Sequence, residues 1–478
     1  MIAATSALHA SANTSREPEH LTRDERVERG KLARALTPRE SQAEFDSTRS
    51  RDPVGLLLEQ ETTRVPELVP IRHGRMLASP MAYYRGAALP MTVDLAQTPV
   101  SGLRVQLCGD AHLSNFGAFA SPERRLVFDI NDFDEALPGP FEWDLKRLAA
   151  SFVVAGRANG FGAKARRAIT TTVAATYRTA MRAFARQTRM QVWYSHLDVE
   201  EAVAAHRSQM PPKQFKAVQA TLAEARSRDS VQAMHKLTTL VDGHRRIIND
   251  PLTMVAVEDV YGDIQSDQIY DLLRTVYAKY RRSLRSDRRR LLEHFDLIQA
   301  ARKVVGVGSV GQRDWMVLLE DDENEPMVLQ AKQAQESVLT DYCGHSRYRN
   351  QGERVVAAQH LMQAFSDIFL GWTHTVGADG VDRDFYVRQL KDWKFSFPIE
   401  QMRPEGMTVY AHLCAWTLAR AHACSGDRVA LAAYLGGSDV FDRAIAEFAE
   451  VYADQNDRDY ATFQEAAKTG QIEAVTGV

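Results

Sequence analysis

The residues best suited to chemistry lie in two neighbouring segments, GDAHLSNFG and VFDINDFDE. Asp110 and Asn115 stand five residues apart in the first segment, and Asp132 follows a strand-like run in the second. Phosphoryl transfer needs a carboxylate that orients the attacking hydroxyl and hard oxygen ligands for Mg²⁺. An Asp, an Asn five residues on and a second Asp after a strand meet both needs, so this spacing predicts a phosphotransferase site.

A purely structural interpretation stands beside this one, because Asp and Asn are common in turns between strands. The second segment weakens it by crowding acids into one short loop, namely Asp129, Asp132, Asp134 and Glu135. Like charges held that close oppose folding unless something neutralises them. A bound divalent cation would do so, as would full exposure to solvent, and Asp129 and Asp134 stay open as alternative ligands.

A second cluster lies far downstream, where Gly306, Gly308 and Gly311 form the pattern G-x-G-x-x-G. The third glycine is followed by QRDWMVLLE, which alternates as a strand does, whereas in a dinucleotide-binding fold it would open a helix. A glycine-tipped hairpin over phosphates is the kinase arrangement. The alternative is a tight hairpin that uses glycine for its conformational freedom.

Lys332 ends the next strand, MVLQAK, at the place where a kinase carries the lysine that pairs the nucleotide phosphates. An exposed lysine at a strand end is the structural alternative. A kinase also holds this lysine with an acid, and Glu336 and Glu353 are both candidates for that role. The strand FYVRQL is expected to lead into an adenine-binding hinge near Gln389 and Lys391, by analogy only.

The elements that must position these residues follow from hydrophobic periodicity. Two short apolar runs, 103–108 and 125–130, predict strands next to the acidic segments. Apolar residues at helical spacing over 144–186, with further segments to about 299, predict a helical region. Three strands over 303–339 predict a small antiparallel sheet, followed by a helix over 352–365, a strand over 385–390 and a helix over 410–423.

These elements divide the chain into four expected parts. They are a flexible N-terminal tail over 1–52 with one or two short helices, a catalytic-loop and helical region over 53–300, a small nucleotide-binding sheet region over 301–400, and C-terminal helices over 401–478 that pack on the helical region.

Composition limits the partners and the compartment. The net charge of −3 gives no overall attraction to nucleic acid or anionic membrane, and the basic run 281–290 predicts a solvated helix face. No stretch is long and apolar enough to cross a membrane, and the four cysteines form no CxxC pair. We therefore expect a cytoplasmic protein without a disulfide framework.

The acidic segments resemble the aminoglycoside phosphotransferase and choline kinase group of the protein-kinase-like fold. The residues that match its G-D-x-H-x-x-N, D-F, G-P and D-L pattern are Asp110, His112, Asn115, Asp132, Phe133, Gly139, Pro140, Asp144 and Leu145. The resemblance implies an α+β two-lobed fold and a reaction that uses ATP and Mg²⁺ to phosphorylate a hydroxyl.

The same resemblance implies a role for each residue. Asp110 would be the catalytic base or hydroxyl-orienting carboxylate, Asn115 and Asp132 would bind Mg²⁺, and Asp144 would be an internal anchor of the helical lobe. His112 would be structural. The motif style favours a small-molecule acceptor over a protein.

The order of the segments departs from ordinary kinases, because the glycine segment and Lys332 follow Asp132 instead of preceding Asp110. This order predicts a circularly permuted chain in which YAHLCAWTLARAHA is the helix that would normally lead into the catalytic loop. From about residue 51 to 460 the sequence is similar to the bacterial DUF2252 family, through blocks such as PELVPIRHGRM, QLCGDAHLSNFG, DINDFDE and KVVGVGSVG.

Two other functions stay open. A nucleotide-binding regulatory protein with little turnover, a pseudokinase, would keep the same cleft. A metal-dependent phosphoesterase would also use D-x-H, but the chain lacks the G-D-x-x-D and G-N-H blocks of that class.

Overall fold

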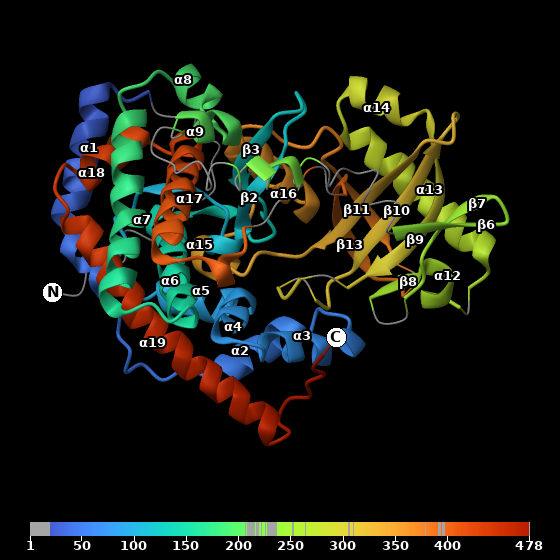
Figure 1. The fold of residues 1–478 in the computed structure, drawn as a ribbon, viewed down its shortest axis with the longest axis horizontal. Coiled ribbons are helices and arrows are strands. Elements are labelled where there is room, and N and C mark those ends of the chain that lie inside the picture. The colour runs from blue at the N-terminus through green and yellow to red at the C-terminus, as the bar shows by residue number, and fades with distance from the viewer. Residues whose placement is uncertain are drawn as a thin grey trace.

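The computed structural model describes residues 20–205, 237–250, 253–262, 264–304, 306–308, 310–377, 379–390 and 397–477, with a few single residues between 206 and 236 and Trp393. A six-stranded sheet lies at one end of the molecule and a group of long helices at the other (Figure 1). The chain is therefore an α+β protein.

The six-stranded sheet is antiparallel throughout the pairs that it forms, in the order β12-β13-β11-β10-β9-β8. Its strands are β8 (Met254–Ala256), β9 (Phe295–Lys303), β10 (Asp314–Asp321), β11 (Pro326–Ala334), β12 (Gly371–Val376) and β13 (Asp382–Gln389). Successive side chains of a strand point to opposite faces. Gln330 and Lys332 accordingly line one cavity while Leu329 and Ala331 line another.

Helices cover the sheet. α13 (Ser266–Ser283) runs along it beside β12, and α12 (Val257–Val260) and α14 (Ser286–Leu292) lie next to α13. α16 (Gln351–Met362) contacts β11, β12 and β13 and also the long helix α17 (Pro404–Ser425), so it joins the sheet to the helical region.

The helical region is built from α6 (Phe141–Ala158), α7 (Ala163–Phe184), α17, α18 (Arg428–Leu435) and α19 (Val440–Lys468). All but the last two residues of α6 are buried, because α7, α17 and α19 pack around it. The main hydrophobic core lies here and extends to the acidic segments through Leu113, Phe116 and Phe133.

The acidic segments sit on two small sheets between these regions. β1 (Arg104–Leu107) pairs with β4 (Leu137–Pro140), and β3 (Leu126–Ile130) pairs with β2 (Phe116–Ala120) and β5 (Leu197–Asp198). Short helices precede them: α2 (Pro53–Glu61), α3 (Val69–Met76), α4 (Pro80–Gly86) and α5 (Ala88–Leu95). β6 (Thr238–Val241) and β7 (His244–Ile247) form a separate hairpin.

Most predicted elements are found, but three expectations need correction. The helical stretch expected to about residue 299 contains β6, β7 and β8, and the boundary expected at residue 300 falls inside β9. The described part of the expected flexible tail is packed into the fold: α1 (Arg23–Leu36) lies against α18, and Arg26 pairs with Asp427 at 2.7 Å. Residues 1–19 lie outside the described part.

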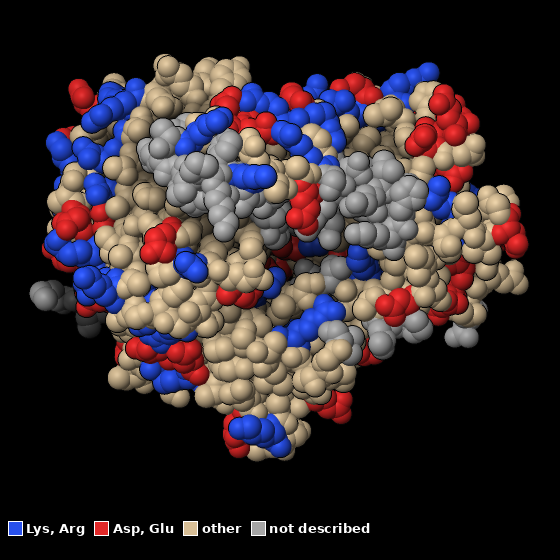
Figure 2. All heavy atoms as spheres, in the orientation of Figure 1, with Lys and Arg blue, Asp and Glu red and all other residues tan. Residues whose placement is uncertain are grey.

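Surface charge agrees with the small net charge. On the face drawn in Figure 2, acidic and basic side chains are mixed over both the helical and the sheet regions. Within the described residues, no helix has the length and apolar character that crossing a membrane requires.

Candidate functional site

A cleft of about 810 Å³ opens between the six-stranded sheet and the acidic segments. Six of the seven residues predicted from sequence line it: Asp110, Asn115, Asp132, Gly306, Gly308 and Lys332. The seventh, Gly311, is outside the described lining and packs instead against the Arg64 side chain. Two segments far apart in sequence therefore meet at one cavity.

Asp144, near the start of α6, holds the loop that carries Asp110 through hydrogen bonds to its backbone. The two carboxylate oxygens of Asp144 accept the backbone N–H groups of Cys108, at 2.8 Å, and Gly109, at 3.0 Å. His422 of α17 contacts the same carboxylate at 3.2 Å. Gly109 itself has φ +82° and lies so close to Glu135 that a Cβ would meet its carbonyl oxygen at 2.3 Å.

Asn115 is held by the same loop. Its amide nitrogen donates to the backbone oxygen of Asp110 at 2.7 Å, and its own backbone oxygen accepts the N–H of Asn131 at 2.8 Å. Because the amide nitrogen is used in this way, the side-chain oxygen of Asn115 is the atom left to serve as a ligand.

Asp110 has a partner that the sequence analysis did not assign. The guanidinium of Arg147, one turn beyond Asp144 on α6, donates from Nε to Oδ1 of Asp110 at 2.5 Å. Burial raises the pKa of the Asp110 carboxyl, and Arg147 opposes that shift. Burial, with Arg85 and Arg147 nearby, holds the pKa of His112 well below its usual range, so this ring is neutral.

Lys332 is paired with the acidic loop. Its Nζ lies 3.5 Å from Oδ2 of Asp134 across 198 residues of chain, and it stands over the Tyr386 ring at 5.7 Å. Burial alone would lower the pKa of this lysine, but Asp134, Tyr386 and Asp132 raise it well above the ordinary value. Lys332 is therefore a buried cation and not an exposed lysine at a strand end.

The acid that holds Lys332 is thus Asp134, and not either of the two candidates from sequence. Glu336 contacts His345, while Glu353 lies in the first turn of α16, where Asn350 caps its backbone N–H. Burial raises the pKa of Asp134, with Asp132 adding to the shift and Lys332 opposing it. Sequence had marked Asp134 only as an alternative metal ligand.

Neighbouring strands supply a further charged residue that lines the cleft, Arg388, and one buried acid beside Lys332, Asp314. Arg388 of β13 is two positions from Tyr386 and so faces the same side of the sheet, where it lines the cleft. Asp314 of β10 pairs directly with Lys332 across the strands and bonds Gln330 at 2.8 Å. Burial raises the pKa of Asp314 to about 6, although Lys332 opposes the shift. The alternation of FYVRQL was the one sequence feature that could have pointed to Arg388.

The glycine segment is attached to the short helices that precede the acidic segments. Arg75 donates to the backbone oxygen of Gly306 at 2.7 Å, and the N–H of Val65 donates to that of Gly311 at 2.7 Å. Gly306 has φ +70° and Gly311 φ +88°, conformations that favour glycine. Val305, Ser309 and the Lys391 of the expected hinge lie outside the described residues, while Gln389 lines the cleft.

The donor set fits a magnesium ion that is also bound by phosphate oxygens. In the described part of the chain, no three His, Cys, Asp or Glu side chains converge as a protein-only metal site would require. Mg²⁺ usually takes one or two carboxylates and completes its shell with water and phosphate. Asp132 and Asn115 offer hard oxygen atoms in the cleft, and Oδ1 of Asp134 is buried with no hydrogen-bond partner among the described residues.

An antiparallel sheet joined to a helical region, with a charged cleft between them, defines an α+β protein. The model of the DUF2252 family, an uncharacterised protein family conserved in bacteria, matches residues 64–466, and the chain belongs to this family. Comparison with curated proteins and with solved structures finds no match to the chain.

Proposed function

We propose that the protein is a kinase-like phosphotransferase that uses ATP and Mg²⁺ to phosphorylate a hydroxyl group, on a small molecule rather than a protein. One observation carries the proposal: the acidic loop and the glycine segment with Lys332 line the same cleft although 198 residues separate Lys332 from Asp134. A buried lysine paired with a carboxylate beside further oxygen ligands is the arrangement that kinases use to hold nucleotide phosphates.

ATP would supply the phosphoryl group, and Mg²⁺ would neutralise the charge on its phosphates. Lys332, kept protonated and oriented by Asp134, would contact the phosphate oxygens. Asp132 and the side-chain oxygen of Asn115 would hold the metal, and Gly306 and Gly308 would let the backbone approach the phosphates closely. Gln389, at the end of β13, lines the cleft and would contact the base.

Asp110 would orient the acceptor hydroxyl. Its Oδ1 is engaged by Arg147, so Oδ2 is the oxygen that remains for the substrate. Arg147 opposes the rise that burial causes in the pKa of the Asp110 carboxyl, and the contact fixes the orientation of the carboxylate. This pairing favours a role in positioning the hydroxyl over a role as a strong base, and it suits a loose transition state in which little proton transfer is needed early.

The proposed fold is a protein-kinase-like pair of lobes with a permuted chain. The six-stranded sheet would be the small lobe and α6, α7, α17 and α19 the large lobe. The end of α17 lies beside β1, where Ser425 Oγ accepts the backbone N–H of Gln106 at 3.1 Å. Joining α17 to β1 would restore the ordinary kinase order, which supports a circular permutation.

The ion pair between Arg147 and Asp110 also favours a second candidate, a nucleotide-binding protein with little turnover. An arginine that occupied the catalytic carboxylate in every state would leave binding intact and slow the transfer. Both candidate proteins would bind the nucleotide at the same site, and they differ only in whether a phosphoryl group is then transferred.

The test is calorimetric titration of ATP, with and without Mg²⁺, into the wild type and into Lys332→Met and Asp132→Asn. We expect Mg²⁺-dependent binding by the wild type and at least a tenfold loss of affinity in each variant. Lys468→Met, at a lysine with 72% side-chain exposure, is the matched control and should bind like the wild type.

Folding of each variant is checked by its thermal midpoint, since Lys332 is buried. A wild type that binds no ATP, or variants that fold and bind with unchanged affinity, would disprove the proposal. Transfer is then sought with a panel of small hydroxyl compounds, and binding without transfer to any acceptor would favour the second candidate.

A further inference from the structure

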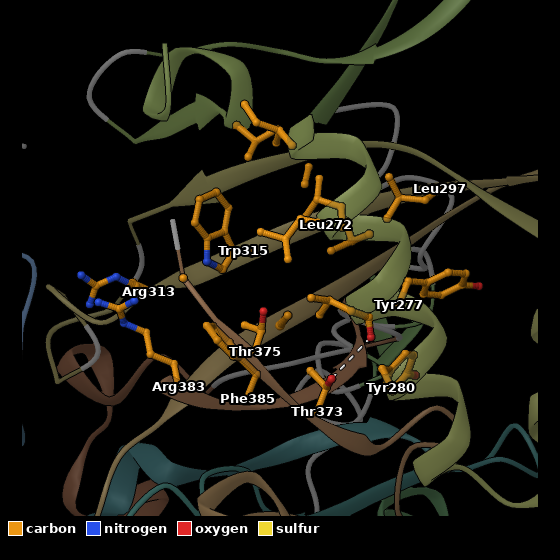
Figure 3. A pocket seen from close by; sticks show the side chains of 18 of the residues that line it. Leu272, Tyr277, Tyr280, Leu297, Arg313, Trp315, Thr373, Thr375, Arg383 and Phe385 are labelled. Carbon is orange, nitrogen blue, oxygen red and sulfur yellow. Dashed lines mark hydrogen bonds between the residues drawn. The ribbon is translucent and has the colours of Figure 1, made fainter. Parts of the chain in front are cut away.

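A second cavity lies on the reverse face of the six-stranded sheet, underneath α13. It has a volume of about 250 Å³ and its walls are almost wholly apolar, with Trp315, Leu329 and Phe385 on the sheet side and Leu272 and Tyr277 on the helix side (Figure 3). It shares no described lining residue with the charged cleft. The two cavities are therefore separate sites, on opposite faces of the same sheet.

The cavity exists because the sheet carries small residues where the helix is held away from it. Ala300 of β9 and Ala331 of β11 form part of the floor, where larger side chains would fill the space. The second half of α13 is fixed to the region of β12 by hydrogen bonds, from Thr373 to Val276 at 3.4 Å and from Trp372 to Ser283 at 2.9 Å. Residues along most of the helix, from Gln268 to Tyr280, line the hollow.

Closely packed interiors leave few voids larger than a water molecule. An apolar cavity of about 150 Å³ is already large enough to bind benzene and stays free of water. The cavity under α13 is larger and reaches solvent beside Leu272 and Val376, whose side chains are 40% and 50% exposed. Its size and lining suit an apolar chain that enters from this side.

Charged residues mark one end of the cavity. Arg313 and Arg383 lie together there in Figure 3, away from Tyr277 and Tyr280 at the other end. Arg383 donates a hydrogen bond from Nη1 to Asp379 at 2.6 Å. Arg313 lies farther from Asp379, at 3.8 Å, and its Nη1 donates to the side-chain oxygen of Gln333 at 3.4 Å. Two guanidinium groups face one carboxylate, so this end attracts an anion.

We propose that this cavity binds a small amphipathic molecule that has one apolar chain and an anionic head group. The chain would lie under α13 against Trp315 and Ala331, and the head group would bind Arg313 and Arg383 in competition with Asp379. Burial of the chain supplies most of the binding free energy, and the arginines decide which head group is accepted.

The probe is decanoate, titrated into the full chain by calorimetry and followed by tryptophan fluorescence. We expect saturable binding at one site, with a fluorescence change that is lost in Trp315→Phe. Ala331→Leu fills the floor of the cavity and should weaken binding at least tenfold while the thermal midpoint is unchanged or higher. Ala168→Leu, at an exposed alanine of α7 that does not line the cavity, is the matched control.

The head group is tested separately. Arg313→Gln should weaken decanoate binding about tenfold, and Asp379→Asn should strengthen it, because it removes the competing carboxylate. Decan-1-ol, which has the same chain without the charge, should bind at least tenfold more weakly than decanoate. The control Arg285→Gln changes an arginine with 85% side-chain exposure outside the cavity lining and should have no effect.

Three results would overturn the inference. The first is a wild type that shows no saturable binding of decanoate. The second is binding that survives Ala331→Leu in a folded variant, which would place the ligand elsewhere. The third is equal affinity for decanoate and decan-1-ol, which would show that the arginines do not select an anion.

Discussion

Asp144 is predicted to hold the loop that carries Asp110, and Asp144→Asn tests this directly. The carboxylate is 1% exposed and accepts the backbone N–H groups of Cys108 and Gly109, one on each oxygen. An asparagine keeps one accepting oxygen but turns an NH₂ group toward the other backbone donor. One hydrogen bond to a charged group is lost and one buried N–H is left unsatisfied.

Each of these two effects costs about 1 to 3 kcal/mol, so we expect Asp144→Asn to destabilise the protein by about 2 to 6 kcal/mol in total. His422 contacts the same carboxylate at 3.2 Å and would be disturbed as well. The substitution is nearly isosteric, so lost packing contributes little.

The assay is urea unfolding at constant pH, combined with hydrogen exchange of the Cys108 and Gly109 amides. The exchange measurement matters because a chain of 478 residues need not unfold in one step. We expect a lower midpoint and faster exchange at both amides in the variant. Asp271→Asn, at a surface aspartate whose side chain is 77% exposed, should change neither quantity. An Asp144→Asn protein as stable as the wild type, with both amides still protected, would refute the anchoring role.

The same site supports three further predictions. Gly109→Ala should destabilise the fold more than Gly160→Ala, as thermal melting of the two variants would show. Both glycines have positive φ, where a β-carbon costs about 1 to 2 kcal/mol, but only at Gly109 would the new carbon also meet a backbone oxygen. Burial raises the pKa of Glu135 to about 7 from 4.5, so its contribution to stability is fully present below pH 4.5 and is lost as pH rises through 7. Urea midpoints of the wild type should therefore fall relative to those of Glu135→Gln over this range, and parallel curves would contradict the raised pKa. Lys332→Met should destabilise the protein by about 3 to 5 kcal/mol because it leaves Asp134 buried without its cation. Adding Asp134→Asn should recover part of the loss in a double-mutant cycle. Additive losses of stability would mean that the two side chains are not coupled.

Much of the site could be predicted because its residues carry their own local evidence. Asp110, Asn115 and Asp132 lie within 23 positions on one short stretch, and their types and spacing are readable without any tertiary contact. The strand after the glycine segment, β10, was readable from its alternation, whereas β9 lies mostly in the stretch predicted as helical. The two strands pair, as a glycine-tipped hairpin requires. Asp144 was identified as an anchor through the family pattern, and its contacts agree with that role.

Other predictions failed where local periodicity was weak. β6, β7 and β8 are strands of only three or four residues, and a hairpin partner or a neighbouring strand supplies their hydrogen bonds. The segment that contains α1 is rich in charged residues and looks mobile in sequence, yet Arg26 and the buried faces of Gly30 and Ala33 dock it on α18. In both cases the determining contacts come from other parts of the chain.

The sequence by itself determined which chemistry is available: carboxylates, an asparagine, glycines and a lysine in the patterns that phosphate chemistry uses. The tertiary structure decided which of these groups meet and in what charge state. Long-range pairs such as Lys332 with Asp134 and Arg147 with Asp110 depend on how the sheet and α6 pack around the cleft, and burial there sets the pKa of each partner. Sequence spacing holds no information about such contacts, because the chain between the partners can be of any length.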